Sequence, residues 1–254
     1  MTGMYRGSRK HVLDWVEHPT FLAELLALVR RTVVRLTPTP IYMPLGYAVP
    51  REARLERFGP KFLPGLSAWK DLQQWWLAHP KGANTPNWDI ALGCEINGQS
   101  GLILVESKAN VPELSEGGKF SDPKASKNSK ENHERIADAI TEAREGFVRS
   151  GYYIDIDRDR HYQLSNRLAF TWKLATLGIP TVLVYLGFTG DKGISDAGEP
   201  FRDEAHWKEV FRAYAAGVKV ASLFEQERPI VVNGTAIWCL IRARPVLENS
   251  PKLK

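Results

Sequence analysis

The sequence predicts an α/β fold, in which helices flank a mixed β-sheet, and three patterns indicate it. Two Asn-Gly pairs, at 97–98 and 233–234, each separate two apolar runs, as is typical of β-hairpins. The run 181–188 is continuously apolar and follows a helical stretch after a short turn, as in α/β units. We therefore expect one domain over 1–254, with an α-helical N-terminal extension at 1–85 and a sheet-containing core at 86–254.

Helical patterns dominate the N-terminal part. Apolar residues recur on one side of 20–36, and the stretches 51–59 and 67–79 have the same character. The prolines of 37–46 favour irregular or edge structure, and Pro80 is expected to stop the helix before it. The aromatic residues of the third pattern are expected in the core, and these are Trp69, Trp75 and Trp76.

The core is expected to contain strands and helices in alternation. The first hairpin pairs 87–96 with 101–110, and the polar, breaker-rich stretch 117–132 is expected to be a long surface loop. The remaining elements are expected to be helices at 131–149, 162–178 and around 207–218, a strand at 181–188, and a second hairpin at 228–243.

Composition indicates an ordinary globular chain with a mild basic excess. The sequence has 34 Lys and Arg against 29 Asp and Glu, a formal charge of +5, which is compatible with a polyanionic partner. No apolar run is long enough to cross a membrane, so we expect a cytoplasmic protein without a membrane partner. Cys94 and Cys239 lie in apolar runs and are expected to be reduced core residues.

The basic residues form two clusters along the chain. Each is compatible with a track for backbone phosphates and equally with solvated surface charge. The first consists of Arg51, Arg54, Arg57 and Lys61, and the second of Lys119, Lys124, Lys127 and Lys130.

Polar side chains end the first hairpin. If the turn is centred on Gly98 and Gln99, paired residue numbers sum to about 197, which places Asp89 opposite Lys108 and Glu106 opposite Ala91. Side chains alternate along a strand, so Asp89, Glu106 and Lys108 are expected on one face. The apolar residues of the hairpin are expected on the other face, and they are Trp88, Ile90, Leu92, Ile96, Ile103 and Val105.

This arrangement suits a divalent cation. Two close carboxylates repel each other unless a cation such as Mg²⁺ lies between them, and the carbonyl oxygen of Ser107 is a candidate further ligand. A lysine beside such a metal can orient a water or stabilise charge on a phosphate oxygen. The combination predicts metal-assisted hydrolysis of phosphodiester bonds, with Asp89 and Glu106 binding Mg²⁺ or Mn²⁺ and Lys108 acting on the attacking water or the developing charge.

The pattern of Asp89, sixteen residues, and then Glu106-Ser107-Lys108 resembles the signature of the PD-(D/E)XK nuclease superfamily. The resemblance implies a restriction-endonuclease-like fold, with the acids on adjacent strands of a hairpin. It also implies a polar residue on a helix after the motif, a position that Gln163 and Arg167 match as candidates for orienting the substrate.

The sequence departs from that signature before the first acid. Trp88 stands where the family has proline, and Pro86 lies two positions earlier. The superfamily often adds an acid from an N-terminal helix, for which Glu24 is the candidate, although it falls on the polar side of its expected helix.

The expected function is therefore a Mg²⁺-dependent nuclease that cleaves DNA by in-line attack of water, with the lysines at 119–130 contacting backbone phosphates. One alternative is a catalytically silent nucleic-acid-binding or interaction module on the same fold, and another is a metal-dependent enzyme with a different substrate. The sequence leaves the oligomeric state open, a homodimer included.

Overall fold

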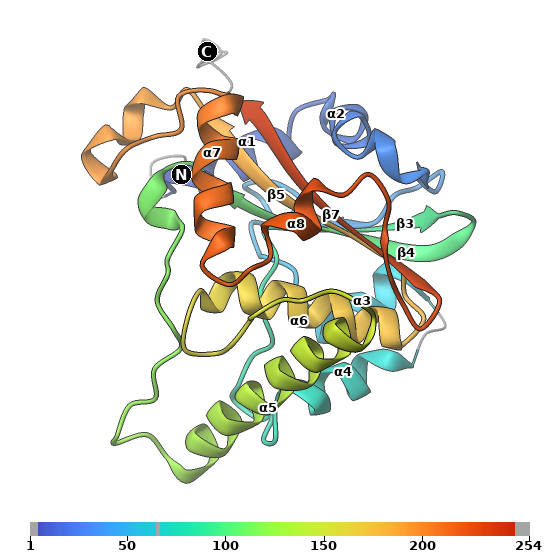
Figure 1. The fold of residues 1–254 in the computed structure, drawn as a ribbon. Helices are drawn as coiled ribbons and strands as arrows, with labels where there is room; N and C mark the ends of the chain where they lie inside the picture. The colour runs from blue at the N-terminus through green and yellow to red at the C-terminus, as the bar shows by residue number, and fades with distance from the viewer. Residues whose placement is uncertain (1–4, 65–66, 247–254) are drawn as a thin grey trace.

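The computed structural model describes residues 5–64 and 67–246, and the ends of the expected domain, 1–4 and 247–254, lie outside the described residues. A seven-stranded mixed sheet runs through this part of the chain in the order β1-β3-β4-β5-β7-β6, with β2 also paired to β3 (Figure 1). The strands are β1 (Val34–Arg35), β2 (Tyr42–Met43), β3 (Ile90–Ile96), β4 (Gln99–Lys108), β5 (Thr181–Thr189), β6 (Ile230–Val232) and β7 (Thr235–Pro245).

Helices cover both faces of this sheet, so the predicted α/β class is confirmed. The two hairpins, β3–β4 and β6–β7, are antiparallel, whereas β5 lies parallel to both β4 and β7. The α-helices are α1 (Gly7–Val16), α2 (Phe21–Leu28), α3 (Leu55–Phe62), α4 (Ala68–Trp76), α5 (Lys127–Arg149), α6 (Tyr162–Thr176), α7 (Glu204–Ala216) and α8 (Ala221–Glu225).

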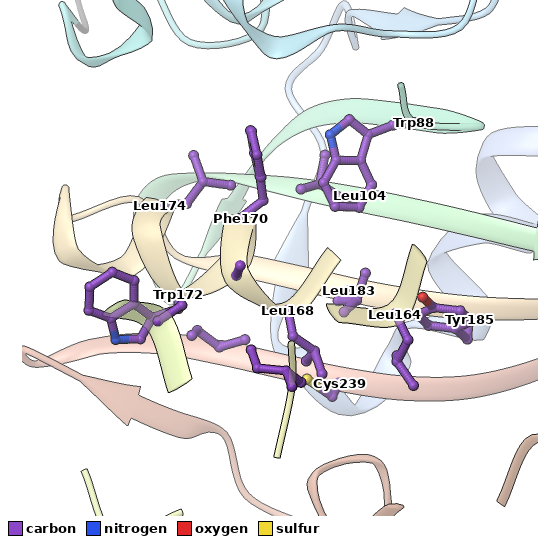
Figure 2. Close-up of a cluster of buried hydrophobic side chains, with 14 of the residues drawn as sticks. Trp88, Leu104, Leu164, Leu168, Phe170, Trp172, Leu174, Leu183, Tyr185 and Cys239 are labelled. Atoms are coloured by element: carbon purple, nitrogen blue, oxygen red, sulfur yellow. The ribbon is translucent and has the colours of Figure 1, made fainter. Parts of the chain in front are cut away.

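Alternation along the strands divides the core into two apolar clusters. On one face Leu102 and Leu104 of β4 pack with residues of α3 to α8, and on the other Ile103 and Val105 pack with residues of α1 and α2. Figure 2 shows the first cluster, with α6 side chains such as Leu168 among residues of the sheet. Glu106 and Lys108 continue the same alternation and therefore lie on the face that α6 covers.

Helix α6 is held at this face by apolar contacts on nearly all sides. Eleven of its residues are buried, and the ring of Phe170 meets that of Trp76 of α4 edge-on at 4.8 Å between centroids. Burial of a large aromatic side chain contributes about 3 kcal/mol. Because α6 is fixed in this way, polar residues on its sheet-facing side are held close to the end of β4.

The turn of the first hairpin differs from the expected one by a residue. The structure pairs Ile96 with Gln99, so paired numbers sum to 195 and the turn consists of Asn97 and Gly98. Both have positive φ, 51° and 78°, as a type I′ turn requires. Asparagine and glycine tolerate this region better than Gln99 would, which explains the shift.

The corrected register changes which polar residues face each other. Continuing it beyond Ile90↔Val105 places Asp89 opposite Glu106, not opposite Lys108. The assignment of Trp88 to the other face was also wrong, because Trp88 precedes β3, pairs with Ala53 in an isolated bridge, and packs in the cluster beneath α6.

Two helices predicted in the first half of the chain are cut short at one end. The helix expected at 20–36 ends at Leu28, because Val33 takes a left-handed conformation and the next two residues pair with β3 as β1. The helix expected at 51–59 begins only at Leu55, since Ala53 bridges to Trp88. The proline-rich stretch contributes β2 at the sheet, in agreement with the predicted edge structure.

The later elements follow the predictions more closely. The expected loop ends earlier, because Ser126 caps α5 by accepting from the Ser129 amide, so Lys127 and Lys130 lie on a helix. The short helices α1 and α8 were not predicted.

The three tryptophans of α4 and both cysteines are buried as expected. No helix of the described ranges has the length and apolar character needed to cross a bilayer.

We predict that Gly98→Ala lowers the free energy of unfolding by about 1 kcal/mol, because alanine disfavours the left-handed conformation at this position. Urea unfolding of the variant measures the change, and Ser100→Ala, two residues along and in extended conformation, serves as the matched control. Equal stability of Gly98→Ala and wild type would contradict the turn assigned here.

Candidate active site

Glu106 is the centre of the polar cluster at the end of the hairpin. Its side chain is buried, and each of its two carboxylate oxygens contacts a different positively charged side chain. Lys108 Nζ lies 2.6 Å from Oε1, while Arg167 of α6 donates to Oε2 from Nε at 2.8 Å and has its Nη2 in ion-pair contact with the same oxygen at 2.6 Å. The two contacts from one guanidinium fix the carboxylate in orientation as well as in charge.

The cations have further partners that hold them in place. Lys108 Nζ donates to Gln163 Oε1 at 2.9 Å. Arg167 donates from Nη1 to Asn166 Oδ1 and from Nη2 to the carbonyl of Asn87, and its guanidinium lies 4.7 Å from the centre of the Trp88 ring. The structure thus brings both helix candidates, Gln163 and Arg167, to the hairpin acids and amine.

The charges of this cluster shift each other's pKa. Burial by itself would raise the pKa of Glu106, but the charges of Arg167 and Lys108 outweigh burial and lower it. Burial likewise opposes the charged form of Lys108, and the carboxylates of Glu106 and Asp89 raise its pKa above the ordinary value. Glu106 is therefore ionised and Lys108 protonated at neutral pH.

Asp89 lies just before β3 and has a different environment. Its Oδ2 accepts from the Ser107 amide at 2.7 Å and from the Ser107 hydroxyl at 2.9 Å. Burial, followed by the nearby charge of Glu106, raises the pKa of Asp89 to about 7, although Lys108 acts in the opposite direction. Asp89 is thus the acid of the pair whose charge changes near neutral pH.

A third carboxylate, Glu52, adjoins this pair and was not singled out from the sequence. The bridge of Ala53 to Trp88 is antiparallel, which places Glu52 beside Asp89, and the charge of Glu52 contributes to the raised pKa of Asp89. Its position depends on that bridge. Since 51–59 resembles a helix in sequence, no local pattern pointed to this contact.

The other sequence candidates lie elsewhere. Glu24 is on the opposite face of the sheet, where it accepts from Trp15 Nε1 and Arg244 Nε, each at 2.8 Å. Lys119 is half-buried over the ring of Tyr162, while the other lysines of its cluster are exposed, and they are Lys124, Lys127 and Lys130.

The donor set fits the expected metal in its chemistry. Carboxylate oxygens are the ligands that Mg²⁺ prefers, and the two acids lie close enough for one to raise the pKa of the other, the electrostatic state that a cation relieves. Both oxygens of Glu106 are in ion pairs, however, so a metal ligand role for Glu106 requires Lys108 Nζ to leave Oε1. In the described ranges, no three His, Cys, Asp or Glu side chains are arranged to hold a metal ion.

Comparison with known proteins adds no family to this geometry. The chain matches no family model, no curated protein and no solved structure.

We predict that wild-type protein loses stability relative to Asp89→Asn as the pH rises from 5 to 8. The pKa of Asp89 is higher in the folded protein, about 7, than the 3.8 expected when unfolded. The native state therefore binds the extra proton between these values, and its stability falls as the pH rises through that window. The Asp89→Asn variant has no such proton, and the difference should be about 1–2 kcal/mol.

Urea unfolding at pH 5 and pH 8 in the presence of EDTA measures this difference, with Asp138→Asn, an exposed position on α5, as the control. A stability difference between wild type and Asp89→Asn that is the same at both pH values would contradict the assigned environment of Asp89.

Proposed function

We propose that the protein is a metal-dependent nuclease that hydrolyses phosphodiester bonds of DNA. The observation that carries the proposal is the convergence of two carboxylates and an amine at the end of one hairpin, with Asp89 opposite Glu106 and Lys108 bonded to Gln163. A cluster of this composition matches the chemical needs of phosphodiester hydrolysis, in which negative charge builds up on phosphate oxygens.

The order of elements supports a restriction-endonuclease-like version of the fold. The hairpin β3–β4 carries the acids, α5 and α6 follow it, and β5 then lies parallel to β4. The signature Asp89, Glu106 and Lys108 and the helix residues Gln163 and Arg167 meet at the end of these strands. This agrees with the PD-(D/E)XK resemblance, which we propose as the family of the chain.

In the proposed mechanism Asp89 and Glu106 would hold a Mg²⁺ or Mn²⁺ ion, and that ion would supply positive charge at the scissile phosphate. Arg167 keeps Glu106 ionised and in a fixed orientation through Oε2, so that Oε1 remains the oxygen available for exchange. Once its Nζ has left Glu106 Oε1, Lys108 would stay beside Gln163 and could donate to the attacking water or to a phosphate oxygen.

A specific contact favours one alternative, a catalytically silent nucleic-acid-binding module. Lys108 and Arg167 together neutralise Glu106, so the cluster is electrostatically satisfied by protein groups alone. A structural ion-pair network of this kind can perturb pKa values without catalysis. The two functions differ in whether divalent cation changes the DNA.

We predict that the purified protein cleaves DNA only with Mg²⁺ or Mn²⁺, and that Glu106→Ala and Lys108→Ala each reduce the rate by at least about 100-fold. The assay uses plasmid, linear duplex and single-stranded DNA, with EDTA as the blank. Glu95→Ala removes an exposed acid from the same hairpin and should leave the rate unchanged. Equal cleavage by all variants, or no cleavage by the wild-type protein, would contradict the proposed function.

A further inference from the structure

A basic cavity lies beside the candidate site. It has a volume of about 240 Å³ and is lined by four arginines and one acid. At about 30 Å³ for one water, it has room for a phosphate group with several waters. The residues that matter here are Arg9, Arg51, Arg54, Arg57, Glu52 and Asn87.

The backbone connects this cavity directly to the candidate site. The Ala53–Trp88 bridge sets Arg54 beside Asn87, and Arg54 Nε donates to Asn87 Oδ1 at 2.8 Å. The carbonyl of the same asparagine accepts from Arg167, the partner of Glu106, at 2.6 Å. Asn87 therefore has its side chain at the cavity and its carbonyl at the ion-pair cluster.

The charges in the cavity are poorly balanced. Arg9 Nη1 forms an ion pair with Glu52 Oε1 at 3.5 Å, but this buried atom has no hydrogen-bond acceptor among the described residues. Arg51 and Arg57 are exposed, and neither forms an ion pair within the described ranges. A buried donor without an acceptor is costly, and four guanidinium groups around one cavity repel each other. An anion would relieve both.

We propose that this cavity binds a backbone phosphate of the nucleic-acid strand whose neighbouring phosphate lies at Asp89 and Glu106. A guanidinium presents parallel donors that match two phosphate oxygens, so arginines suit this ligand better than they suit a point charge. The inference rests on the proposed function in that both phosphates belong to the same substrate. Arg51 and Arg57 are positioning residues here, since they set the register of the strand and do not touch the reacting atoms.

The test measures binding of a fluorescent single-stranded oligonucleotide in EDTA, so that cleavage plays no part. The double variant Arg51→Gln/Arg57→Gln should bind about tenfold more weakly and should show a shallower dependence of affinity on salt concentration. The matched control, Arg35→Gln/Arg228→Gln, removes two exposed arginines outside the cavity and should bind like wild type. Circular dichroism and urea unfolding check that both double variants are folded.

A polyaspartate peptide of the same charge separates phosphate recognition from general attraction. Loss of oligonucleotide binding without a matching loss of peptide binding supports the proposal. Equal losses for both ligands, or equal losses for both double variants, would overturn it. If Arg51→Gln/Arg57→Gln binds the oligonucleotide more weakly but the wild-type protein never cleaves DNA, the phosphate-binding cavity is supported and the nuclease proposal fails. If the wild-type protein cleaves DNA but Arg51→Gln/Arg57→Gln binds the oligonucleotide as tightly as wild type, the nuclease proposal is supported and the cavity proposal fails.

Discussion

The buried carboxylate of Glu106 is the constraint on which this end of the fold depends. Strand β4 is apolar from Leu102 to Val105, and then places the charged side chain of Glu106 under α6, where only 3% of its surface is exposed. Removing a carboxylate from water costs several kcal/mol unless it is paired and hydrogen-bonded. Lys108 supplies one partner from the same strand, and Arg167 supplies the other from α6.

This pairing ties together three segments that are distant in sequence. Arg167 reaches Glu106 of β4, the carbonyl of Asn87 and the ring of Trp88, so α6, the hairpin and the segment before β3 share one guanidinium. Trp88 in turn bridges to Ala53, which brings the arginines of the cavity to the site. The apolar packing of α6 and this polar cluster therefore support each other.

The two acids are expected to respond differently to their surroundings. Glu106 is held ionised by its cations, whereas the pKa of Asp89 is raised to about 7. A proton and a divalent cation would therefore compete mainly at Asp89, and we expect metal affinity to fall below neutral pH. The proposed function uses this difference, with Lys108 as the group that has to move away from Glu106 Oε1.

Much of the fold could be predicted because its signals are local. The two Asn-Gly pairs, the apolar run of β5 and the stripe of α6 are each signals local to one stretch of the chain. Both hairpins, the strand and the helix form, with the first turn one residue earlier than predicted. The convergence at the hairpin followed from strand alternation, and Gln163 followed from the family resemblance.

What could not be predicted depends on contacts across the chain. A shift of the turn by one residue decides whether Asp89 faces Glu106 or Lys108, and the periodicity of the strands is the same in both registers. The bridge of Ala53 to Trp88 overrides the helical character of 51–54, and with it the position of Glu52 beside Asp89. Neither the sequence of 51–54 nor that of the hairpin contains this information alone.

The most direct test of the proposed site measures the binding of Mn²⁺ to the protein at pH 8, with the electron paramagnetic resonance signal of the free ion as the readout. We expect that wild-type protein binds Mn²⁺, that Asp89→Asn loses this binding, and that Lys108→Met binds more tightly because the competing ammonium is gone from Glu106 Oε1. Equal Mn²⁺ binding by wild type and Asp89→Asn, or no binding by any of the three, would contradict the proposed metal site.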